Sequence, residues 1–90
     1  MVRQKVVIKN KSGLHLRPAT IFSKIAAGCA SDIKLIKGDK TVNPKSILFL
    51  MSAGVKCGDE IELVCSGETA HDDMQTLIDA INSGLGEDDE

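Results

Sequence analysis

The stretch DIKLIKGDKTV, residues 32–42, shows how this chain pairs with itself. Its first half alternates apolar and charged residues, with Ile33 and Leu35 on one face, which is the period-two pattern of a half-buried strand. The pair Gly38-Asp39 fits a two-residue hairpin loop with glycine first, and residues 40–42 then return as a partner strand. We therefore predict an antiparallel hairpin here, and an antiparallel sheet around it.

Two more stretches, residues 2–8 and 60–66, alternate in the same way and are predicted to be strands. The residues expected to face the core are Val2, Val6, Ile8, Ile61, Leu63 and Cys65. Val64 and the charged residues between them are expected on the opposite side, since successive side chains of a strand point to opposite faces. One face of the sheet should therefore be polar and the other covered.

Three helices are predicted from start and stop signals and from apolar residues at helical spacing. The signals are, in chain order, Pro18 and Gly28, Ser46 and Gly54, and Thr69 and Gly84. Apolar stripes mark the two long helices, with Ile21, Phe22, Ile25, Ala26 and Cys29 on the first and Ala70, Met74, Leu77, Ile78, Ile81 and Leu85 on the last. The middle helix has at most two turns.

This order of elements predicts an α+β fold of the open-faced sandwich type. Its four-stranded antiparallel sheet would carry the helices, two long and one short, packed on one face. A chain of 90 residues has room for one core, so we expect a single domain over residues 1–86. The acidic residues 87–90 are expected to form a flexible tail.

Composition argues against several classes of function. The net charge is −2, and Trp and Tyr are absent, so the basic surface and stacking platforms of nucleic-acid binders are missing. No apolar stretch approaches the roughly 18 residues of a membrane span, and no signal-peptide pattern opens the chain, so we expect a cytoplasmic protein. Three cysteines and two histidines show no metal-ligand spacing, which predicts no metal, cofactor or disulfide framework. The cysteines are expected to be small core residues.

The segment SGLHLRPA, residues 12–19, places His15 and Arg17 where a glycine-containing loop enters a helix. Unpaired amides at a helix start favour an anion, and the guanidinium of Arg17 matches phosphate oxygens. A neutral imidazole can attack phosphorus through a ring nitrogen, so a phosphohistidine is one interpretation of His15. The other is a capping or loop histidine beside a solvated arginine.

The run SILFLM, residues 46–51, puts five apolar residues on a helix too short to bury every face. Two interpretations stay open, a docking surface for a partner and a wholly buried run. Ser46 itself reads as a helix N-cap or as a modifiable hydroxyl, whose phosphate would lie at the helix start beside Lys45. His71, next to two aspartates at the start of the last helix, is expected to be an exposed side chain without a functional role.

The two motifs resemble those of a known family. GLHLRPA at residues 13–19 is similar to the active centre, and NPKSI through MSAG at 43–54 to the regulatory-serine motif, of the histidine-containing phosphocarrier proteins of the bacterial phosphoenolpyruvate-dependent sugar phosphotransferase system. The resemblance covers nearly the whole chain. It implies that His15 accepts a phosphoryl group on Nδ1 from phosphorylated enzyme I and passes it to sugar-specific IIA proteins, while Arg17 neutralises the phosphate.

The same resemblance implies regulation and a docking surface. Ser46 would be the target of an ATP-dependent serine kinase and its phosphorylase, linking the carrier to a catabolite-control transcription regulator. The partner-docking residues would be Leu16, Thr20, Ile47, Leu48 and Met51. Leu16 stands where the family usually has Ala, and Phe49 is bulkier than in many members, so both bear on partner preference. The protein is expected to be a monomer without membrane insertion.

Two other functions fit the sequence. One is a regulatory or nitrogen-related paralogue of the family, although a purely regulatory form would lack the acceptor that His15 provides. The other is a small phosphate-ester hydrolase in which Arg17 holds the phosphate and an ordered water attacks it. We expect a carrier rather than an enzyme, because the leading interpretation has no turnover of its own.

Overall fold

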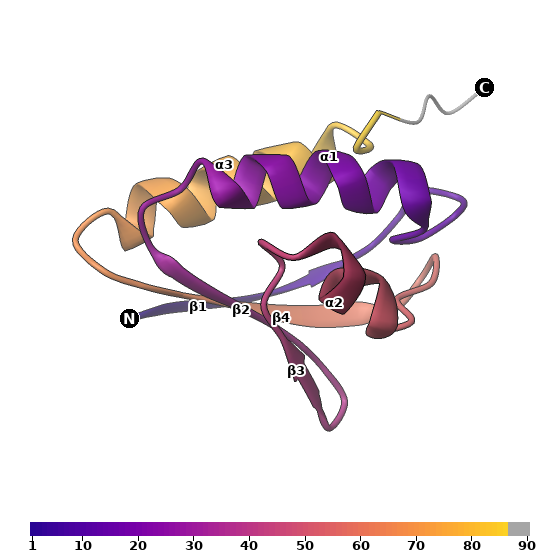
Figure 1. Cartoon of the computed structure of the whole chain (residues 1–90), viewed down its shortest axis with the longest axis horizontal. Helices are drawn as coiled ribbons and strands as arrows, with labels where there is room; N and C mark the ends of the chain where they lie inside the picture. Colours follow the sequence, from indigo (N-terminus) through magenta and orange to yellow (C-terminus); the bar gives the residue numbers. More distant parts are fainter. Residues whose placement is uncertain (87–90) are drawn as a thin grey trace.

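The computed structural model describes residues 1–86 and contains one antiparallel sheet with three helices (Figure 1). The elements in chain order are β1 (Val2–Val7), α1 (Leu16–Ala27), β2 (Asp32–Lys37), β3 (Lys40–Val42), α2 (Ile47–Ser52), β4 (Glu60–Ser66) and α3 (Ala70–Asn82). The strand order is β1-β4-β2-β3, so the last strand of the chain lies between the first two. The predicted open-faced sandwich is confirmed. The acidic residues 87–90 lie outside the described part.

Helices α1 and α3 lie side by side in a layer on one side of the sheet, and the short α2 lies below them, where it overlaps β4 in this view (Figure 1). Helices α1 and α3 pack against each other, and the short α2 packs against α1. The core between the layers is aliphatic apart from one aromatic ring, and its fully buried members include Phe22, Leu35, Leu50, Leu63 and Leu77. Burial of each such side chain contributes about 1.5–3 kcal/mol, which is the main term that holds the helices on the sheet.

Local signals placed most element ends correctly. Lys37 pairs with Lys40 across the two-residue turn, and Gly38 adopts the left-handed φ of 59° that the turn requires. At the start of α2 the Ser46 hydroxyl accepts a hydrogen bond from the Phe49 amide at 3.4 Å. Gly54 follows the last turn of α2 with φ 66°, as a helix-terminating glycine does.

Burial adds to one expectation and contradicts another. Val64 lies on the open face as expected, yet it is only 6 % exposed: it belongs to the inner strand β4, and its register neighbours are Arg3 on β1 and Lys34 on β2, whose long side chains can cover it. Cys57 is exposed in the loop before β4, whereas Cys29 and Cys65 lie in the core as expected. The alternation of apolar and polar residues predicts which face a side chain lies on, but not whether side chains of the two neighbouring strands cover it.

The start of α3 also differs in detail from the prediction. Thr69 occupies the N-cap position, but its side chain makes no capping hydrogen bond. Its hydroxyl instead donates to Asp73 Oδ2 at 2.8 Å. None of the helices within residues 1–86 is long and apolar enough to span a membrane.

Candidate functional site

His15 is the N-cap residue of α1, and its side chain is exposed. Its backbone is extended, with φ −81° and ψ −169°, and its carbonyl accepts the first helical hydrogen bond from Ala19 at 2.8 Å. The imidazole makes no capping hydrogen bond. The amides of Leu16 and Arg17 have no partner within the helix, so an anion bound at the ring would meet free N–H groups at its side.

The loop that delivers His15 is held by backbone contacts rather than by side chains of the site. The Leu14 amide donates to the Val55 carbonyl at 3.0 Å, and the Leu14 side chain is buried. The Asn10 side-chain amide donates to the Gly13 carbonyl at 2.5 Å. Gly13 has φ 62° and lies directly against the backbone of Val55, where no side chain fits. These contacts set the path of the backbone up to the histidine.

Arg17 lies two residues into α1 and is exposed. The chain returns to it after α3, through a turn in which Gly84, Leu85 and Gly86 all have positive φ. A Cβ built on Gly86 would lie 3.7 Å from Arg17 Nε, and Leu85 is fully buried beside this turn. The structure thus brings Gly86 next to the guanidinium of Arg17.

The apolar run on α2 divides into one buried residue and an exposed group. Leu50 is fully buried, while the exposed fractions of Leu48 and Phe49 are 80 % and 60 %. Leu16 on α1 is also 60 % exposed. We refer to Leu16, Ile47, Leu48 and Phe49 as the apolar patch. Thr20 and Met51, the other two predicted docking residues, are half-buried.

Phe49 is the member of the patch that the sequence interpretation left out of the docking residues. The feature of the sequence that could have indicated its exposure is the shortness of α2. This helix has six residues and buries only Leu50, and the residue next to Leu50 points to a different side of the helix. The wholly buried alternative for residues 46–51 is therefore wrong. The interpretation of exposed apolar side chains on this helix is confirmed.

The Lys45 side chain was expected to lie beside a phosphate on Ser46, but its ammonium is bound elsewhere. Its ammonium donates to the carbonyls of Cys29 and Ser31, at 3.1 and 2.8 Å, and so ties the start of α2 to the loop after α1. The Ser23 hydroxyl donates to the Lys45 carbonyl at 3.0 Å from the middle of α1. A charge on Ser46 would therefore not find a free lysine at the neighbouring position.

A second polar cluster at the far end of α1 is structural. Asp73 Oδ2 accepts hydrogen bonds from the amide and hydroxyl of Ser31 and from Thr69, and these bonds lower the pKa of that carboxyl, with the Ser31 hydroxyl first. Burial raises the pKa of the thiols of Cys29 and Cys65. Among residues 1–86 no group of three or more His, Cys, Asp or Glu side chains is placed to hold a metal ion. His71 is exposed, as predicted.

Charge is segregated along the chain in a way that bears on the site. All 11 lysines and arginines lie within residues 3–56, where Asp32 and Asp39 are the only acidic residues. Helices α1 and α2, which carry the candidate residues, contain no acidic side chain, whereas α3 contains no lysine or arginine. A partner that covers His15 and the apolar patch would meet a neutral to basic surface.

Comparison with known proteins agrees with this arrangement. The family model described as the PTS HPr component phosphorylation site matches residues 2–83. The chain is 43 % identical over 77 residues to the HPr-like protein Crh of Bacillus subtilis, covering 86 % of this chain and 91 % of that protein. It is 38 % identical over 87 residues to phosphocarrier protein HPr of Neisseria meningitidis serogroup B, covering 97 % and 98 %.

A solved structure extends the similarity to three dimensions. The crystal structure of HPr-C-His from Thermoanaerobacter tengcongensis matches with a TM-score of 0.93 at 40 % identity, covering 98 % of this chain and 99 % of that one. The match spans the whole sheet, the three helices and the loop that carries His15. With the fold, the motif around an exposed His15 and these relatives in agreement, the chain belongs to the HPr family of phosphotransferase-system phosphocarriers.

Proposed function

We propose that this protein is a phosphoryl carrier in which His15 Nδ1 accepts a phosphoryl group from phosphorylated enzyme I. The bond between phosphorus and the donor breaks as the bond from Nδ1 to phosphorus forms, and a second transfer passes the group to a sugar-specific IIA protein. The observation that carries the proposal is the exposed imidazole of the N-cap residue of α1, beside free helix amides. Such a transfer needs mainly positioning and charge neutralisation.

Arg17 is proposed to neutralise the transferred phosphate. It is exposed two residues after His15 on the same helix start, and a guanidinium donates two parallel hydrogen bonds to phosphate oxygens. Arg17→Ala should slow transfer while the protein stays folded, because a charge-assisted contact is lost from the transition state. An unchanged rate at low salt would show that Arg17 is only a solvated charge.

The apolar patch, together with Thr20 and Met51, is proposed as the surface on which enzyme I and the IIA proteins dock. Its exposed side chains adjoin a helix that carries Arg17 and Lys24 and no carboxylate. This combination fits partners with an apolar centre and an acidic rim. We further propose a monomeric, cytoplasmic protein with one domain over residues 1–86.

Ser46 is proposed as a regulatory phosphorylation site, used by a serine kinase and phosphorylase and read by a catabolite-control transcription regulator. A second function deserves a test because of the similarity to Crh: a regulatory paralogue that acts through Ser46 alone. The presence of His15 favours the carrier, since a purely regulatory protein has no use for the acceptor.

The deciding experiment mixes the purified chain with phosphoenolpyruvate and enzyme I and measures intact mass. We expect one acid-labile, alkali-stable phosphoryl group on the wild type and on the control His71→Ala, and none on His15→Ala, with native circular dichroism throughout. Phosphate on His15→Ala would refute the assignment. Continuous release of phosphate from an acyl phosphate would instead indicate the hydrolase.

A further inference from the structure

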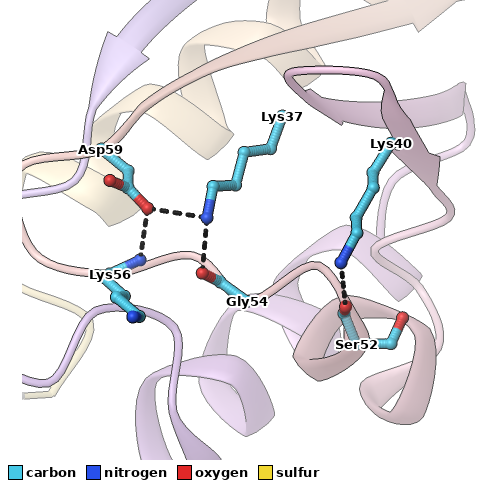
Figure 2. A network of polar contacts seen from close by, with 6 residues as sticks. All are labelled: Lys37, Lys40, Ser52, Gly54, Lys56 and Asp59. Atoms are coloured by element: carbon cyan, nitrogen blue, oxygen red, sulfur yellow. Dashed lines mark hydrogen bonds and ion pairs between the residues drawn. The ribbon is translucent and has the colours of Figure 1, made fainter.

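Lys37, the last residue of β2, reaches across to the loop between α2 and β4. Its ammonium donates to the Gly54 carbonyl at 2.6 Å and lies 2.9 Å from Asp59 Oδ2 (Figure 2). The same carboxylate oxygen accepts a hydrogen bond from the Lys56 amide at 2.8 Å. One lysine and one aspartate therefore hold the two ends of the loop, residues 54–59, in a fixed relation to each other.

This loop is also the support of the segment that carries His15. The Val55 carbonyl accepts the Leu14 amide at 3.0 Å, and Gly13 lies against the Val55–Lys56 peptide. His15 is the next residue after Leu14. A continuous path of contacts thus runs from Lys37 through Gly54 and Val55 to the backbone that immediately precedes the imidazole.

We propose that Lys37 and Asp59 are positioning residues for phosphoryl transfer: they fix the Val55 carbonyl, and through Leu14 they fix the place of His15. The proposal rests on the proposed carrier function and deepens it. Neither residue touches the imidazole in this arrangement, so their effect is on where the acceptor lies rather than on its chemistry.

The contribution of the pair should be local rather than global. The Lys37 and Asp59 side chains are 30 % and 31 % exposed, and ion pairs of this kind contribute little to overall stability because water screens them. Loops open at a lower free-energy cost than the core. Loss of the ion pair should therefore increase local opening of the 54–59 loop before it affects global unfolding. The Lys56 amide, and then Lys37, lower the pKa of Asp59, so its carboxylate stays ionised at neutral pH.

Lys40 provides a contrast within the same network. It extends from β3 to the Ser52 carbonyl at the end of α2, at 3.4 Å, and does not contact the 54–59 loop in the cluster drawn in Figure 2.

The matched control for charge removal is Arg3→Met, because Arg3 forms a comparable ion pair with Glu62 at 3.1 Å on the open face of the sheet. Neither arginine nor glutamate there adjoins the His15 loop.

The test combines amide hydrogen exchange with transfer kinetics from phosphorylated enzyme I. In Lys37→Met we expect the Leu14 amide to exchange about tenfold faster while the slowest core amides are unchanged. The kcat for phosphoryl uptake should fall about tenfold with an unchanged KM, because the docking surface is intact. Lys37→Arg should restore both, since a guanidinium can span the same two acceptors, and Arg3→Met should match the wild type.

Asp59→Asn gives a second, gentler variant. It keeps an acceptor for the Lys56 amide but loses the ion pair, so its Leu14 exchange should lie between the wild type and Lys37→Met. Unchanged Leu14 exchange in both variants, or an equal loss in Arg3→Met, would overturn the proposal. If Lys37→Met unfolds, Asp59→Asn and Lys37→Arg decide by the same criteria. A wild type that takes up no phosphate would refute the carrier function, whereas the exchange result tests the positioning separately.

Discussion

Gly13 lies against the peptide that joins Val55 to Lys56 so closely that no other residue fits. A Cβ at Gly13 would stand 2.6 Å from Lys56 Cα and nearer still to the Val55 carbonyl oxygen, and the glycine has φ 62°. This position therefore requires both properties of glycine: a backbone that can adopt a positive φ, and the absence of a side chain. The contact sets the path of the chain two residues before His15.

Gly13→Ala should destabilise the protein by about 1–3 kcal/mol, because a left-handed conformation and a backbone clash must both be relieved. Urea unfolding measures the loss, and uptake of phosphate from enzyme I should slow as the His15 loop shifts. Gly38→Ala is the control, since Gly38 has a similar φ of 59° with nothing within 4 Å of an added Cβ. Equal losses in the two variants would show that the close approach to Val55 is without consequence.

Much of the fold follows from signals that act within a few residues. The Gly38 turn, the Ser46 cap and the period-two strands were predictable because each depends on neighbours in sequence. The Asp73 cluster was not, since it joins Ser31 to α3 across 42 positions. The reach of Lys45 to two carbonyls is equally invisible to local spacing.

The candidate site divides in the same way. His15 and Arg17 could be proposed from the sequence because glycine, histidine, arginine and proline in one short segment indicate phosphate chemistry. The ion pair of Lys37 and Asp59 could not be predicted, because only the packing of the hairpin onto the 54–59 loop brings the two residues together. Phe49 was recognised as unusual, but its exposure depends on how α2 is seated on α1.

Asp73→Asn should lower stability at neutral pH and lose its effect in acid. Hydrogen bonds from Ser31 and Thr69 lower the pKa of the folded carboxyl below its unfolded value, so the folded state gains from ionisation. That gain is complete above the unfolded aspartate value of about 3.9 and is lost as the pH falls through the folded pKa. Thermal melts should show a melting temperature a few degrees below wild type at pH 7.

The two proteins should begin to converge as the pH falls below about 4, and should become equal once it has passed the lowered pKa of the folded wild-type carboxyl. Asp79→Asn, an exposed position on the same helix, serves as the control and should change stability by less than about 0.5 kcal/mol. A difference between Asp73→Asn and wild type that stays constant from pH 7 to pH 2 would contradict the ionic origin of the effect.

Phe49→Ser should separate docking from folding. Because Phe49 is 60 % exposed, its loss should change the free energy of unfolding by less than about 0.5 kcal/mol, while the KM for phosphorylated enzyme I or for the IIA protein rises several-fold. Leu50→Ala, one position later and fully buried, should cost about 2–5 kcal/mol. A normal KM with both partners in Phe49→Ser would remove Phe49 from the docking surface.

Ser46→Asp should impair transfer without harming the fold. Its carboxylate can accept the Phe49 amide in place of the hydroxyl, and Asp caps helices about as well as Ser, so the melting temperature should be unchanged or slightly higher. The new charge adjoins Ile47 and Leu48 and is not neutralised by Lys45, whose ammonium is held by two carbonyls. An acidic partner closing over the patch must therefore repel or desolvate it, at a cost that can reach a few kcal/mol.

Ser46→Ala supplies the opposite change at the same position. It removes the cap, which should cost about 1 kcal/mol of stability, but leaves the surface neutral, so transfer from enzyme I should stay normal. Melting temperature and the KM for phosphorylated enzyme I should be measured on both variants. We expect Ser46→Asp to raise the KM without loss of stability, and Ser46→Ala to lose stability with an unchanged KM. A normal KM in Ser46→Asp would contradict a docking surface at Ser46. Loss of both docking and stability in Ser46→Asp would also contradict it, because the weaker docking could then result from damage to the fold.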